Sequence, residues 1–241
     1  MFEWSSSDVI FLPIALAIII VITVILHFTM QDRSKNIRKI PLHIITGLIL
    51  VLEIAKQVYY IVVGYNYQAI PLHFCSLFLY AFPLMMWTKG KFQLTGNALA
   101  LVSTSMLLIC FYLSPGNILG ATSTANFFND FVSFQTVTYH HLALLYLFVG
   151  LGLDLFDFDI ANIVYFWCGF AFYSIIVVIV ANIVHTEFIS LLEDMITILK
   201  ELRVKFGMAI YSVVTFLLGA GVGGLIFIIE RAINLGIKEK R

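Results

Sequence analysis

Seven stretches of this chain are apolar over about 20 residues each, the length that an α-helix needs to cross the hydrocarbon core of a bilayer. Within each stretch the apolar residues are continuous and do not alternate with polar ones, as helices in lipid require. The sequence therefore predicts an all-α fold, a polytopic transmembrane helix bundle that forms a single integral membrane domain over residues 1–241. The expected spans are residues 9–29, 40–64, 70–88, 93–114, 133–154, 160–185 and 207–230.

The composition agrees with a membrane protein. Hydrophobic residues make up 61% of the 241 residues and charged residues 12%, and the mean hydropathy is +0.99. A soluble domain is about half apolar and about a quarter charged. The 14 acidic and 14 basic residues balance, which gives no electrostatic basis for binding nucleic acid. We therefore expect membrane lipids as partners and no nucleic acid; the sequence carries no indication of the oligomeric state.

The Lys and Arg residues of the short loops predict the orientation of the chain. Residues 31–39 contain four of them, Lys89 and Lys91 follow the third expected span, and residues 238–241 add three more. Positively charged loops favour the cytoplasmic side. With seven spans, the N-terminus is expected outside and the C-terminus in the cytoplasm, in the cell membrane.

Two features of the C-terminal third are typical of membrane proteins. Residues 187–206 place apolar and charged side chains on opposite faces of a helix, which predicts an amphipathic helix in the interface plane. The run "GAGVGG" at 219–224 has small residues at the spacing that permits close helix contact.

Several expected spans carry polar or ionisable side chains, and such groups need a partner or a purpose at membrane depth. Glu53 and Lys56 are three residues apart on one helix face and can pair with each other. Counted from the outer ends of their spans, Lys56, Cys75 and His141 lie at depths of ~7 to ~12 Å. One layer in the outer leaflet could hold the whole set, which is Glu53, Lys56, Tyr60, His73, Cys75, His140, His141 and Asn182.

Cys75 and a histidine from another span are the candidate catalytic pair. Pro71 is a favoured first residue of a helix, which predicts a helix from that position. On such a helix His73 and Cys75 point in roughly opposite directions, so the base for Cys75 is expected to be His140 or His141. An imidazole that takes the thiol proton and a thiolate that attacks a carbonyl are the minimal arrangement for covalent acyl transfer.

Other interpretations of the same residues remain open. A buried cysteine is usually a small hydrophobic residue, and each histidine is also an interhelical hydrogen-bond donor. The same polar residues could line the pathway of a small-solute transporter or of a substrate-binding subunit, and a structural partner in a membrane complex is a third class. No ligand spacing supports a metal site, so we expect neither a metal nor a cofactor.

Four segments together resemble the YwaF-type integral membrane family of bacteria: "LEIAKQVYYIVVG", "IPLHFCSLFLYAFPL", "YHHLALLYLF" and "ANIVHTEFISL". The resemblance covers about residues 45–195, and its most specific part is Pro-Leu-His-x-Cys at residues 71–75. Beyond Asn182 that family tends towards an Asn-Tyr-rich stretch, from which this chain departs.

The resemblance extends more distantly to a eukaryotic transmembrane protein that is regarded as an acyltransferase building polyunsaturated ether phospholipids. It implies that Cys75 is the acyl acceptor and that His140 or His141 is the base. Glu53 and Lys56 would then order the cavity or hold a phosphate headgroup.

Overall fold

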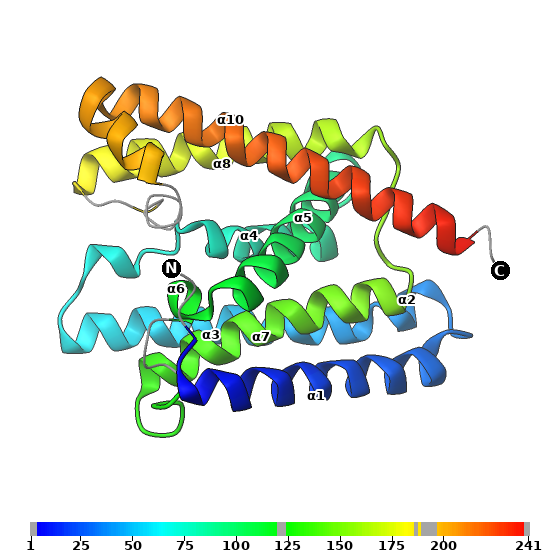
Figure 1. Cartoon of the computed structure of the whole chain (residues 1–241). Coiled ribbons are helices and arrows are strands. Elements are labelled where there is room, and N and C mark those ends of the chain that lie inside the picture. Colours follow the sequence, from blue (N-terminus) through cyan, green and yellow to red (C-terminus); the bar gives the residue numbers. More distant parts are fainter. Residues whose placement is uncertain (1–3, 120–123, 186–187, 189–196, 239–241) are drawn as a thin grey trace. The chain divides into compact units, whose positions relative to one another are not determined.

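Helices make up the fold of the computed structural model, which describes residues 4–119, 124–185, 188 and 197–238 (Figure 1). Within these residues there is no β-strand, so the predicted all-α class is confirmed. The helices are α1 (Ser6–Met30), α2 (Lys35–Arg38), α3 (Ile40–Val63), α4 (Leu77–Trp87), α5 (Lys91–Leu113), α6 (Pro115–Leu119), α7 (Phe131–Gly152), α8 (Asn162–Val184) and α10 (Thr197–Lys238). Two 3-10 turns, η1 (Tyr67–Ala69) and η2 (Phe74–Ser76), precede α4.

Five helical segments of the described chain are long and apolar enough to cross a membrane: Ser6–Met30, Lys35–Val63, Lys91–Leu113, Asn162–Val184 and Val213–Gly236. The helix α7 is also 22 residues long, and it carries the polar residues Gln135, His140 and His141. The chain is therefore a multi-pass membrane protein.

The span predicted over residues 70–88 is wrong in its first third. Its α-helix, α4, begins at Leu77 and not at Pro71, and it has 11 residues. At 1.5 Å per residue α4 is about 16 Å long, which is too short to cross the hydrocarbon core alone. His73 is extended instead, with φ −66° and ψ 156°, and Cys75 lies in the turn η2.

The C-terminal third also differs from its prediction. Nearly half of the predicted amphipathic helix, residue 187 and residues 189–196, lies outside the described residues. Its remaining part is continuous with the last span, because α10 is one helix of 42 residues. The boundary between the helix predicted over 187–206 and the span predicted over 207–230 is therefore absent, because one helix crosses it. An α-helix of this length extends about 63 Å, twice the thickness of the hydrocarbon core, so α10 must project beyond the bilayer.

The chain divides into two compact units. Unit 1 comprises residues 1–69 and 104–156, and unit 2 comprises residues 70–103 and 157–241. The prediction of a single integral membrane domain stays a prediction.

In unit 1, α7 packs against both α1 and α3. The buried side chains of α3 recur every three or four residues, which gives the helix one inner face that ends in Glu53. Buried residues occur on most faces of α7, as expected for a helix between two neighbours. Its N-terminus is capped by Asp130, whose carboxylate accepts from the Ser133 backbone N–H at 2.8 Å. This bond holds the pKa of Asp130 below its usual value.

In unit 2, close packing depends on glycines. A Cβ atom at Gly223 would collide with the ring of Phe166, and one at Gly219 with the ring of Phe170, where α10 packs against α8. The predicted close helix contact at 219–224 is therefore confirmed. A third glycine, Gly96 of α5, lies against the backbone of α4 at Leu84 and Met85.

Candidate functional site

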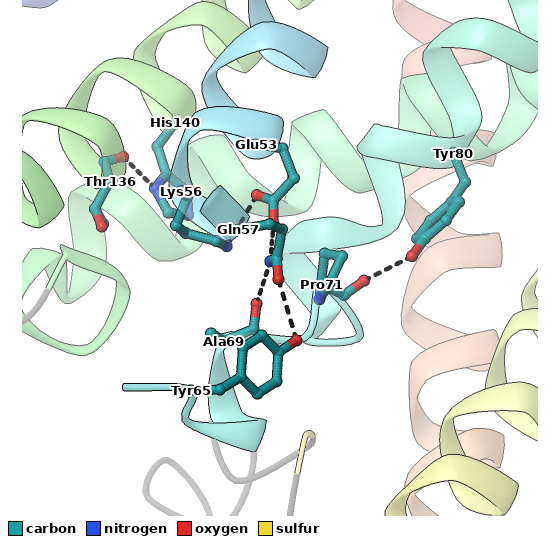
Figure 2. A network of polar contacts seen from close by, with 9 residues as sticks. All are labelled: Glu53, Lys56, Gln57, Tyr65, Ala69, Pro71, Tyr80, Thr136 and His140. Carbon is teal, nitrogen blue, oxygen red and sulfur yellow. Dashed lines mark hydrogen bonds and ion pairs between the residues drawn. The ribbon is translucent and has the colours of Figure 1, made fainter. Parts of the chain in front are cut away.

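The predicted pair of Glu53 and Lys56 forms an ion pair in unit 1, with Lys56 Nζ 2.9 Å from Glu53 Oε2 (Figure 2). Gln57, one turn beyond Glu53, donates from Nε2 to Glu53 Oε1 and to the Ala69 carbonyl, both at 2.7 Å. Its Oε1 in turn accepts from Tyr65 OH at 3.1 Å. The carboxylate of Glu53 is therefore balanced by one charge and one amide on its own helix.

His140 and His141 lie about 100° apart on α7 and share one neighbour. The ring of Phe111 in α5 lies 6.3 Å from that of His140 and 5.0 Å from that of His141. Lys56 of α3 is close enough to act electrostatically on the His140 ring, and Figure 2 shows that ring beside the Lys56 side chain. His141 also contacts the ring of Phe11 in α1, at a centroid distance of 5.8 Å. Both histidines thus have aromatic neighbours, and His140 is the one that also lies near the charged Lys56.

The hydrogen bonds of the two rings fix their tautomers. His140 Nδ1 lies 2.7 Å from the Thr136 carbonyl, and His141 Nδ1 lies 2.7 Å from the Val137 carbonyl. A carbonyl can only accept, so each neutral ring carries its proton on Nδ1 and presents Nε2 as a proton acceptor. Among the residues that the structure describes, the buried Nε2 of His141 has no hydrogen-bond partner.

Cys75 lies in unit 2, in the 3-10 turn η2, and two tyrosines bind the backbone just before this turn. Tyr80 OH of α4 donates to the Pro71 carbonyl at 3.0 Å, and Tyr173 OH of α8 donates to the His73 carbonyl at 2.7 Å. The rings of Tyr80 and Tyr173 lie 5.9 Å apart.

The ring of His73 is held by a hydrogen bond outside the turn. Its Nδ1 lies 3.1 Å from the Phe188 carbonyl. By the same argument its Nε2 is the acceptor nitrogen. The argument that set His73 aside as a base assumed an α-helix through residues 73–75. Because that helix is absent, His73 joins His140 and His141 as a candidate base.

The other predicted residues have local partners. The ring of Tyr60 makes an edge-to-face contact with the ring of the neighbouring Tyr59, at a centroid distance of 5.6 Å. Asn182 is exposed on α8 and donates to the Val178 carbonyl one turn earlier, so nothing in its surroundings supports a binding role. In the described part of the chain no three His, Cys, Asp or Glu side chains are grouped as metal ligands.

An apolar groove of about 380 Å³ lies along α1 in unit 1. Ser7 and Thr124, which hydrogen-bond to each other at 2.9 Å, form part of its lining. Phe11 lines the groove and contacts His141, so one side chain separates the groove from an imidazole. The remaining lining residues are Ile10, Ile14, Ala15 and Ile18.

Sequence reasoning missed Gln57, Tyr80 and Tyr173. The signal for Gln57 was present, because it lies one turn after Glu53 on the same face. Tyr80 and Tyr173 bind backbone carbonyls of a turn that the sequence predicts as helix, so no spacing rule could identify them.

The region that contains these residues matches a known family. A model of the TMEM164 family, a family of transmembrane proteins, matches residues 1–226. The chain belongs to the TMEM164 family. This TMEM164 match includes α1 and most of α10 as well as the Cys75 turn and both histidines. No curated protein and no solved structure matches the chain. The YwaF-type resemblance stays a prediction beside it.

Proposed function

We propose that this protein is a lipid acyltransferase that carries the acyl chain as a thioester on Cys75. The observation that carries the proposal is the place of Cys75, in the 3-10 turn η2 just before α4 and within the Pro-Leu-His-x-Cys segment. Cys110 and Cys168 lie inside the continuous helices α5 and α8. Membership of the TMEM164 family is consistent with the resemblance to an ether-phospholipid acyltransferase.

The proposed reaction has two balanced steps. The imidazole takes the thiol proton, Cys75 Sγ bonds to the ester carbonyl carbon of a donor phospholipid, and the ester C–O bond breaks. The lysolipid oxygen leaves with the proton from the imidazole. An acceptor hydroxyl then gives its proton to the imidazole and attacks the thioester, and the C–S bond breaks to regenerate the thiol.

The base in this scheme is an imidazole Nε2, as the Nδ1–H bonds of His140 and His141 favour. A backbone carbonyl that fixes the tautomer here takes the place of the carboxylate in a Ser-His-Asp triad. Lys56 would hold a phosphate headgroup or, with Glu53, order the polar site. Within unit 1, the α1 groove has a largely aliphatic lining, which suits an acyl chain.

A small-solute transporter is the second candidate function, and the buried Glu53–Lys56 pair is the observation that favours it. Charged pairs at membrane depth are typical of transport pathways. In a transporter, however, the Cys75 thiol has no chemical task.

The Cys75→Ser variant separates the two functions. Purified protein in lipid nanodiscs is given a phospholipid with an isotope-labelled acyl chain and a lysolipid acceptor, and labelled product is measured by mass spectrometry. We expect Cys75→Ser to lose at least about a thousandfold in turnover, as loss of a covalent nucleophile does. The matched controls Cys110→Ser and Cys168→Ser are expected to keep it.

The histidine variants then identify the base. Loss of a general base lowers turnover by about a hundredfold to ten-thousandfold. The loss is expected in His140→Ala or in His141→Ala, and His73→Ala tests the third ring. Full turnover in Cys75→Ser would refute the thioester mechanism.

A further inference from the structure

The backbone just before Cys75 is not α-helical, and two tyrosine hydroxyls bind its carbonyl groups. Residues 70–76 precede α4 without forming α-helix, although Pro71 and the apolar sequence favour a helix there. In a helix the carbonyls of Pro71 and His73 would accept from backbone N–H groups four residues later. A non-helical backbone in a membrane protein must find those partners elsewhere in the protein.

The hydroxyls of Tyr80 and Tyr173 donate to these two carbonyls. Tyr80 OH binds the Pro71 carbonyl, and Tyr173 OH binds the His73 carbonyl, which also accepts from the Ser76 backbone N–H at 2.8 Å. Tyr173 is 8% exposed and comes from α8, a hundred residues away in the sequence. It therefore joins the turn to a second helix of the same unit.

We propose that Tyr80 and Tyr173 form a tyrosine clamp that keeps residues 71–76 out of the α-helix and so fixes the direction of the Cys75 thiol. Both are positioning residues, because they bind the backbone beside Cys75 and not the acyl chain. The consequence for acyl transfer rests on the proposed function. The consequence for the thiol itself does not depend on it.

Two features support a positioning role over simple packing. Both hydroxyls donate to backbone carbonyls of one short segment, those of Pro71 and His73. The two tyrosine rings are also in contact, with centroids 5.9 Å apart. The His73 carbonyl that Tyr173 binds lies two residues before Cys75, so holding this carbonyl also holds the backbone that carries the sulfur. Phenylalanine would fill the same space, so Tyr→Phe removes the donor alone.

The test measures the alkylation rate of Cys75 by a maleimide in the full chain, with Cys110→Ala and Cys168→Ala making Cys75 the sole thiol. Tyr173→Phe and Tyr80→Phe are each expected to raise the alkylation rate about fivefold. This factor corresponds to the net free energy of one hydrogen bond. Tyr112→Phe is the matched control, because Tyr112 OH also donates to a backbone carbonyl, that of Leu12 in unit 1. We expect no change there.

A second readout separates positioning from stability. In the acyl-transfer assay the clamp variants are expected to lose about fivefold in maximal rate while the donor concentration at half-maximal rate stays constant. The wild-type alkylation rate in folded Tyr173→Phe, or equal acceleration by Tyr112→Phe, would overturn the clamp. If Tyr173→Phe does not fold, Tyr80→Phe decides by the same criterion. If wild-type Cys75 accepts no acyl group, the proposed function fails and the alkylation rates still decide the clamp.

Discussion

At the scale of single residues, the polar groups of the spans are satisfied mainly by near neighbours in sequence. Glu53 is 5% exposed, yet its carboxylate binds Lys56 and Gln57 of the same helix. His140 and His141 each bond to a carbonyl four residues earlier. Spacing rules identify such partners, and the Glu53–Lys56 pair was predicted from sequence for this reason.

Removing one member of the ion pair should destabilise the protein more than removing both. Lys56→Met leaves a buried carboxylate without its counter-charge, and we expect a loss of about 3 kcal/mol in the free energy of unfolding. The double variant with Glu53→Gln should recover most of that loss. Thermal unfolding in detergent measures both, and the exposed Lys89→Met serves as a control with a change below about 0.5 kcal/mol. If the double variant loses as much free energy of unfolding as the two single variants together, the pairing is contradicted.

At the scale of elements, the sequence pattern identified most helices. It failed to predict the start of α4, where hydrogen bonds from distant side chains determine the backbone conformation. Pro71 predicted a helix start, but phenol donors from Tyr80 and Tyr173 satisfy the carbonyls and α4 begins at Leu77. The extent of α10 was missed because charged residues near position 200 favoured an interfacial helix, while the helix itself continues.

The close approach of α4 and α5 predicts a strong effect at one glycine. A Cβ at Gly96 would overlap the backbone of Met85, so Gly96→Ala must push two helices apart. We expect it to lower the free energy of unfolding by about 2 kcal/mol or more.

Gly47 of α3 is the matched control for this substitution. It has nothing within 4 Å of an added Cβ, so Gly47→Ala should raise the free energy of unfolding by about 0.5–1 kcal/mol. Equal effects of the two substitutions in thermal unfolding would contradict the packing of α4 on α5.

At the scale of the whole molecule, apolar length and composition were enough to predict an all-helical multi-pass protein. The site was predictable only in part, because some of its contacts form within one helix and others depend on how helices pack. The Glu53–Lys56 pair follows from one helix. The choice between His140 and His141 depends on which helices flank α7, and the sequence alone does not specify those neighbours.

The predicted orientation can be tested on the intact cell. In a background without native cysteines, Ser34→Cys and Asn66→Cys place thiols in the exposed loops before and after α3. Because the basic loop is expected in the cytoplasm, a membrane-impermeant maleimide should label Asn66→Cys directly and Ser34→Cys only after permeabilisation. The reverse pattern would invert the topology.

The most direct test of the account is a search for the acyl-enzyme itself. Purified wild-type protein is incubated with a phospholipid that carries a labelled acyl chain, without acceptor, and the modified peptide is mapped by mass spectrometry. The account predicts a hydroxylamine-sensitive adduct on Cys75 that accumulates without acceptor and disappears when lysolipid is added. An adduct on Cys110 or Cys168 with Cys75 unmodified, or no adduct in a preparation that transfers acyl chains, would contradict it.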